Sequence, residues 1–266
     1  MLTNPNGKEE NPVADARFAE SLGGEEYDDL LLALDFYQEF QEESGKALAQ
    51  YIKEHCAGQV EVKVLEAGPG TGITTLQILK ADPRVKVVSV DNESKMLEVV
   101  KSKFGGSEEY KDRSEFVLAD ILEYLESCPD GSFDAFVSVY TLHNFTPDFR
   151  KKVISVIARK LKSGGIFING DKYSRDVKGH KQDLDGEFRN YEKFDSEAAK
   201  AEEAGDIGRA EHFRQIKEDW TKHTWEDDVN QITVEEQDEM FRELGFKDVN
   251  WLKRFDLVIT VTAIKE

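Results

Sequence analysis

Three glycines at alternating positions, Gly68, Gly70 and Gly72, constrain this chain more than any other feature of its sequence. They follow segment 60–66, which has the residue pattern of a short strand, and precede segment 73–80, which has the apolar spacing of a helix. Glycine is needed where the backbone turns sharply and where a ligand lies against it without a Cβ between them. A strand, a glycine-rich turn and a helix in this order predict a ligand-binding α/β unit.

The alternation of strands and helices continues along the chain and predicts the fold class. Strands are expected at 85–90, 115–118, 133–139 and 166–169, and helices at 94–104 and 147–161. Strands that alternate with helices are typical of a parallel sheet with right-handed crossovers. The last two strands, at 249–252 and 257–264, have a connection too short for a crossover, which predicts an antiparallel pair.

The sequence pattern divides the chain into a tail, one large domain and an insert. Residues 1–17 are polar and are expected to form a flexible tail, whereas 18–266 form a single domain. Within it, residues 18–57 have helical spacing, with Gly45 as a candidate break between two helices. Residues 174–232 are charged and helix-prone and interrupt the alternation, so we expect them to form a helical insert that closes over the substrate.

Charge and cysteine content exclude several classes of partner. The chain has 54 acidic and 35 basic residues, a net charge of −19, which disfavours nucleic acids and anionic membrane surfaces. Only two cysteines, Cys56 and Cys128, occur, so the sequence predicts no disulfide framework and a reducing, cytoplasmic location. No apolar run approaches the roughly 20 residues of a membrane span, and the N-terminus has no signal-peptide pattern.

The glycine-rich turn fits neither of two common nucleotide-binding patterns. A nicotinamide fingerprint needs a third small residue at the position that Ile73 occupies here. A phosphate-binding Walker A loop needs a Gly-Lys-Ser/Thr sequence, which does not follow this turn.

An acidic residue followed by Gly-x-Gly-x-Gly, from Glu66 to Gly72, resembles the first motif of small-molecule class I S-adenosylmethionine-dependent methyltransferases. Further landmarks follow in the order typical of that family, at Asp91, Asp120, 133–144 and 161–165. The resemblance covers residues 18–173 and 233–266. It implies a Rossmann-like, seven-stranded, mostly parallel sheet with an antiparallel closing strand, helices on both faces and a helical lid.

The same resemblance implies a set of residues that bind the cofactor, S-adenosyl-L-methionine. Asp91 would grip both ribose hydroxyls and Asp120 would contact the adenine amino group, although strand-end carboxylates also cap helices. Met96 would pack on the adenine, with ordinary core packing as the alternative, and Tyr27 would reach the cofactor carboxylate. The full set is Tyr27, Glu66, Gly68, Gly70, Gly72, Asp91, Asn92, Met96, Asp120, Ile121 and Val139.

His143 is the first candidate for a catalytic side chain. It follows the expected strand 133–139, and the unperturbed pKa of histidine allows it to take a proton near neutral pH. Tyr140 and Tyr173 also follow strand ends and are rival candidates. The alternative is that His143 has a packing role, and an acceptor that is already a good nucleophile needs no base.

Two looser groups in the insert carry less weight. His180, Asp183, Asp185 and Glu187 lie in a highly charged segment where acidic clusters arise freely, so we predict no metal site. Trp220, His223, Trp225 and Asp227 are interpreted as packing the insert onto the domain, with lining of the substrate pocket as the alternative.

These features together favour an enzyme that transfers the methyl group of S-adenosylmethionine to a small molecule by in-line displacement. Two alternatives remain: a protein that binds the cofactor without methyl transfer, as a sensor or assembly partner, and an enzyme that performs another transfer or modifies the cofactor. The chain is expected to act as a monomer or homodimer. The sequence does not identify the acceptor or the atom that is methylated.

Overall fold

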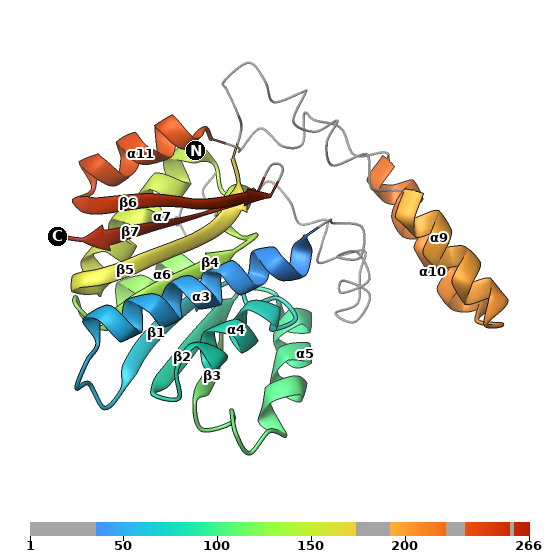
Figure 1. Ribbon diagram of the computed structural model, residues 1–266, viewed down its shortest axis with the longest axis horizontal. Helices are drawn as coiled ribbons and strands as arrows, with labels where there is room; N and C mark the ends of the chain where they lie inside the picture. The colour runs from blue at the N-terminus through green and yellow to red at the C-terminus, as the bar shows by residue number, and fades with distance from the viewer. Residues whose placement is uncertain (1–35, 174–191, 222–231, 256–257) are drawn as a thin grey trace, which may run out of the picture.

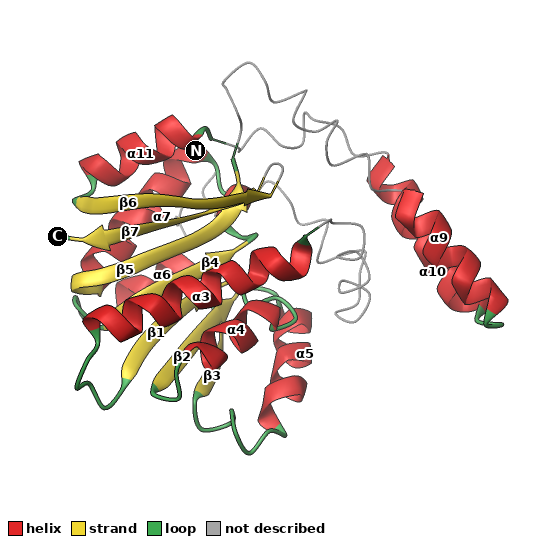
Figure 2. Ribbon diagram, viewed as in Figure 1, coloured by secondary structure: helices red, strands yellow, loops and turns green. Residues whose placement is uncertain are grey.

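The computed structural model describes residues 36–173, 192–221, 232–255 and 258–266 (Figure 1). Its centre is a seven-stranded sheet in the order β3-β2-β1-β4-β5-β7-β6 (Figure 2). The strands are β1 (Val62–Ala67), β2 (Val85–Asp91), β3 (Ser114–Leu118), β4 (Phe133–Val139), β5 (Leu161–Lys172), β6 (Phe246–Phe255) and β7 (Val258–Lys265). Only β7 runs antiparallel to its neighbours, β5 and β6. The predicted α/β fold, with a mostly parallel sheet and an antiparallel closing strand, is confirmed.

Helices cover both faces of this sheet. The described helices are α3 (Tyr37–His55), α4 (Ile73–Ala81), α5 (Ser94–Gly105), α6 (Ile121–Ser127), α7 (Pro147–Lys160), α9 (Glu192–Glu203), α10 (Ile207–Thr221), α11 (Val234–Glu243) and the short 3₁₀ helix η2 (Leu142–Asn144). Figure 1 shows α3, α4 and α5 on one face and α6, α7 and α11 on the other. Successive residues of β1 point to opposite faces. Val64 therefore belongs to the apolar core under α3, α4 and α5, and Leu65 to the core under α6, α7 and α11.

Helix α3 corrects one expectation, because Gly45 does not break it. The helix continues from Tyr37 to His55, and Gly45 is buried within it. A Cβ at Gly45 would lie 3.0 Å from the backbone oxygen of Gln77 in α4. The glycine therefore allows α3 and α4 to approach closely and does not end a helix.

Two local features extend what the sequence predicted. Helix α6 was not expected, yet Asp120 caps it by accepting hydrogen bonds from the backbone nitrogens of Leu122 and Glu123, at 2.8 and 3.1 Å. Strand β5 begins at Leu161, five positions or so before the expected start, and pairs there with Phe133 across a register shift. Helix α11 begins with a capping box, in which Thr233 and Glu236 satisfy each other's backbone nitrogens.

The part of the insert that the structure describes is a pair of helices, α9 and α10, which pack against each other and stand apart from the sheet in Figure 1. Their contact includes the buried rings of Phe194 and Phe213, with centroids 6.4 Å apart. The tail, residues 18–35 and the remaining segments of the insert lie outside the described residues. No helix in the described ranges is long and apolar enough to cross a membrane.

Candidate functional site

Three of the predicted cofactor residues lie at or near the ends of neighbouring parallel strands. Glu66 lies near the end of β1, Asp91 ends β2 and Val139 ends β4. Because β2, β1 and β4 are neighbours in the sheet, their carboxyl ends meet at one edge. Ligands of open α/β sheets bind outside this edge, where the order of strands reverses.

The three positions of the turn after β1 require glycine for different structural reasons. All three adopt positive φ angles, +67° at Gly68, +53° at Gly70 and +91° at Gly72. A Cβ at Gly68 would lie 2.2 Å from the Thr141 hydroxyl oxygen, so only glycine fits beside the segment after β4. A Cβ at Gly70 would meet nothing within 4 Å, so the described residues leave open space on that side of the turn. Gly70 is therefore the position where a ligand can approach the backbone.

Glu66 is a fully buried carboxyl group with one unused oxygen. Its Oε2 atom accepts hydrogen bonds from the hydroxyls of Thr75 (2.8 Å) and Ser89 (2.5 Å). Its Oε1 atom has no hydrogen-bond partner among the described residues. Burial raises the pKa of Glu66 to about 7, against the lowering effect of the two hydroxyls. A buried acceptor without a partner is costly, so Glu66 is well suited to bind a donor or a cation.

The Asp91 carboxylate connects β2 to the glycine-rich turn. Its Oδ1 atom accepts a hydrogen bond from the Glu93 backbone nitrogen at 2.9 Å, and Oδ2 accepts one from the Gly70 nitrogen at 3.4 Å. Burial raises the pKa of Asp91 to about 6, although these backbone hydrogen bonds lower it. With Glu66, it gives the site two acidic groups beside an open backbone turn. These groups fit a cationic ligand that carries a diol.

The other predicted cofactor residues lie in several environments. Asp120 already uses Oδ1 to cap α6, which is the alternative role considered for it. Met96 is 6% exposed on α5, Ile121 is buried at the start of α6, and Asn92 is exposed. Tyr27 lies outside the described residues.

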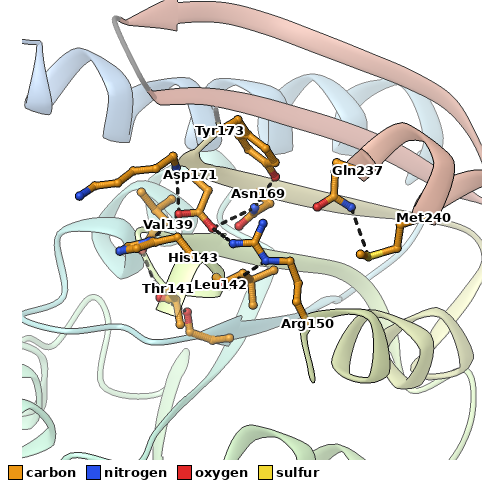
Figure 3. A network of polar contacts seen from close by, with 12 residues as sticks. Val139, Thr141, Leu142, His143, Arg150, Asn169, Asp171, Tyr173, Gln237 and Met240 are labelled. Carbon is orange, nitrogen blue, oxygen red and sulfur yellow. Dashed lines mark hydrogen bonds and ion pairs between the residues drawn. The ribbon is translucent and has the colours of Figure 1, made fainter. Parts of the chain in front are cut away.

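His143 and Asp171 form a close pair beyond the end of β4. The two residues come from η2 and β5, and the distance from His143 Nδ1 to Asp171 Oδ1 is 2.6 Å (Figure 3). Asp171 is completely buried and His143 nearly so, with side chains 0% and 10% exposed. Burial raises the pKa of Asp171, but His143 and Arg150 together lower it by more, so that the pKa lies below its ordinary value. Asp171 therefore remains ionised and orients the ring of His143.

The two tyrosines that rival His143 have different positions. Tyr140 has a φ of +54°, which is strained for a residue with a side chain, and its ring stacks on Tyr37 with centroids 5.9 Å apart. The rings of Tyr140 and His143 also pack edge to face, with centroids 6.2 Å apart. Tyr173 is completely buried, and its hydroxyl accepts a hydrogen bond from Asn169 at 2.8 Å. Tyr140 thus lies beside His143, whereas Tyr173 belongs to the interior.

Sequence reasoning missed Asp171, Arg150 and Tyr37. The only local signal for Asp171 was its place near the end of the fifth strand. No group of three or more His, Cys, Asp or Glu residues that could hold a metal occurs in the described part of the chain. The acidic group at 180–187 and the group at 222–227 lie outside it, and so does the Trp220 side chain.

Comparison with known proteins shows what this chain is similar to. Residues 64–165 match the family described as "Methyltransferase domain". The carboxy-S-adenosyl-L-methionine synthase of Nautilia profundicola is 25% identical over 240 residues, which cover 90% of each chain. The tRNA N(3)-cytidine methyltransferase of Mus musculus is 29% identical over 41% of this chain and 28% of its own. Magnesium protoporphyrin IX methyltransferase from Synechocystis PCC 6803, solved with bound S-adenosylmethionine, aligns over 94% of both chains with a TM-score of 0.58 and 13% identity.

Proposed function

We propose, from the premise that this chain is an enzyme with a class I S-adenosylmethionine-dependent methyltransferase domain, that it methylates a small molecule with His143 as the base. The observation that carries this proposal is the 2.6 Å contact between His143 and the buried Asp171, beside the strand ends that would hold the cofactor. The net charge of −19 supports a small acceptor over a nucleic acid.

The residues divide the work between binding and proton transfer. Asp91, Glu66 and the open turn at Gly70 would hold the cofactor, which supplies an electrophilic methyl group when bound. Asp171 accepts the Nδ1 hydrogen of His143 and so leaves Nε2 as the nitrogen that takes a proton. Alignment of the acceptor supplies most of the acceleration, since positioning alone is worth about 7–11 kcal/mol.

Kinetics of three variants test the role of His143. His143→Ala should lower kcat by roughly 10²–10⁴-fold while cofactor affinity stays nearly unchanged. Asp171→Asn should lower kcat in the same direction, because the ring loses the acceptor that orients it. His55→Ala, at a histidine whose side chain is 54% exposed on α3, is the matched control and should leave kcat unchanged. Wild-type turnover of His143→Ala at every pH from 6 to 9 would exclude His143 as the base.

A second candidate function is modification of the cofactor itself. It is favoured by the Nautilia profundicola relative, which matches 90% of this chain and is named as a carboxy-S-adenosyl-L-methionine synthase. Incubation with methyl-labelled S-adenosylmethionine and a metabolite extract, followed by mass spectrometry, separates the two functions. Methyl transfer moves the label to a new molecule and releases S-adenosylhomocysteine. Cofactor modification instead leaves a sulfonium compound of changed mass.

A further inference from the structure

Arg150 is the largest completely buried side chain in the described residues, and the proposed proton transfer does not use it. It lies on α7, and its guanidinium reaches toward the His143–Asp171 pair from one side (Figure 3). Taking a guanidinium group out of water is costly unless an opposite charge or hydrogen bonds compensate. The partners of Arg150 therefore indicate why it is present.

The side chain of Arg150 contacts the turn before His143, the carboxylate of Asp171 and the ring of Tyr173. Its Nε atom donates a hydrogen bond to the carbonyl oxygen of Leu142, the residue before His143, at 3.0 Å. Its Nη2 atom lies 3.9 Å from Asp171 Oδ2, and its guanidinium carbon lies 5.9 Å from the centre of the Tyr173 ring. Within the described ranges, neither Nη1 nor Nη2 makes a hydrogen bond. Among the described residues, Asp171 is thus the ion-pair partner of this cation.

Several further groups surround the pair and set its charge balance. From β5, the backbone nitrogen of Lys172 donates to Asp171 Oδ1 at 3.0 Å, and Asn169 donates to Oδ2 at 3.3 Å. Tyr173 on the same strand contacts Arg150, and Tyr140 after β4 contacts the His143 ring. From the side of α11, Asp238 accepts a hydrogen bond from Trp251, whose ring meets Tyr173 at 4.9 Å. Within this cluster, the guanidinium of Arg150 and the carboxylate of Asp171 form an ion pair.

We propose that Arg150 is a positioning residue that balances the charge of Asp171 and fixes the turn at Leu142, so that His143 stays oriented and available to accept a proton. A carboxylate beside an imidazole favours the protonated ring, and a cation on the far side of that carboxylate opposes this effect. Arg150 thus balances the charge of Asp171 while Asp171 orients the His143 ring. This inference rests on the proposed function, because a base must be unprotonated before it acts.

NMR titration of the His143 ring in the full chain, without ligand, tests this proposal directly. The His143 signal is assigned by its loss in His143→Gln. Arg150→Gln should raise the midpoint of His143 protonation by about one pH unit, a tenfold gain in proton affinity. Arg150→Lys keeps the charge and should restore the wild-type midpoint. Arg159→Gln, at a half-exposed position of the same helix, is the matched control and should leave the midpoint unchanged.

An unchanged midpoint in folded Arg150→Gln would overturn the proposal. If that variant does not fold, Asp171→Asn and the double variant Arg150→Gln/Asp171→Asn decide the question, since removing both charges leaves no buried charge unpaired. Asp171→Asn should lower the midpoint, because the charge of Arg150 then acts without opposition. The double variant should raise it again, and equal midpoints in these two variants would also contradict the proposal.

Turnover measurements separate this inference from the proposed function. With an identified acceptor, the acid limb of the kcat–pH profile should shift to higher pH in Arg150→Gln, by the same number of pH units as the NMR midpoint. If His143→Ala keeps wild-type turnover while the midpoint still moves in Arg150→Gln, the base assignment fails and the electrostatic role of Arg150 stands. If His143→Ala loses turnover but the midpoint does not move, the base assignment stands and the role of Arg150 fails.

Discussion

At the scale of single residues, Asp91 is expected to carry much of the cofactor affinity. Asp91→Ala removes a half-buried carboxylate that has been placed at the end of β2 beside the open turn at Gly70. The loss should be roughly 2–3 kcal/mol, as for hydrogen bonds to a charged group. Calorimetry with S-adenosylhomocysteine measures it, with Asp112→Ala at an exposed position as control. Equal affinities of wild type and Asp91→Ala would remove Asp91 from the site.

Glu66 makes the stability of the ligand-free protein depend on pH. Its pKa is raised from 4.5 to about 7 in the folded state, so the folded state holds a proton that the unfolded state has lost between these values. The free energy of unfolding should therefore fall as pH rises through this window, by at most about 1.4 kcal/mol per pH unit.

Urea unfolding of wild type and Glu66→Gln at pH 5 and pH 7.5 checks this expectation. The amide cannot ionise, so the variant should lose less stability than wild type over this interval. Asp91, whose pKa is also raised, titrates in both proteins, so the difference between them reports on Glu66 and on its interaction with Asp91. Identical losses in the two proteins would show that Glu66 does not hold the proton.

At the scale of elements, the turn after β1 distinguishes steric from conformational roles of glycine. Gly68→Ala places a Cβ against the Thr141 side chain, whereas Gly70→Ala meets no atom and only strains a positive φ. Gly70→Ala should cost about 1–2 kcal/mol of stability, and Gly68→Ala more. Thermal unfolding should also show that Thr141→Ala partly rescues Gly68→Ala but not Gly70→Ala. Equal costs with no rescue would refute the close approach of Thr141, in the segment after β4, to this turn.

The elements also show how far sequence reasoning reaches. The succession of strand, turn and helix at the glycines, the helix that begins at Pro147, and the candidate positions of Asp91 and His143 near strand ends follow from local patterns, because each depends on neighbours in the chain. The pairing of His143 with Asp171 joins residues 28 positions apart, and Arg150 joins it from a third element. Such buried charges leave no periodic signal, since their partners come together only in the folded sheet.

At the scale of the whole molecule, the α9–α10 pair is expected to serve the acceptor and to contribute little to the stability of the sheet. The two helices pack against each other and stand apart from the sheet in Figure 1. Replacing 192–221 by a short Gly-Ser linker should shift Tm by less than about 3 °C and leave S-adenosylhomocysteine affinity unchanged, while turnover is lost. A variant with full turnover would remove the insert from the acceptor site.

The interior position of β1 in the sheet has a consequence for how the chain is made on the ribosome. In the strand order β3-β2-β1-β4-β5-β7-β6, synthesis first supplies an interior strand and later adds strands on both sides of it. Helix α3 emerges before all of these strands, yet Phe40 packs against Gly170 and Tyr51 donates a hydrogen bond to the carbonyl of Gly164. At roughly 5–20 residues per second, α3 waits several seconds for its partners on β5. During this interval, the residues of α3 that pack against β5 in the folded protein are still uncovered in the nascent chain.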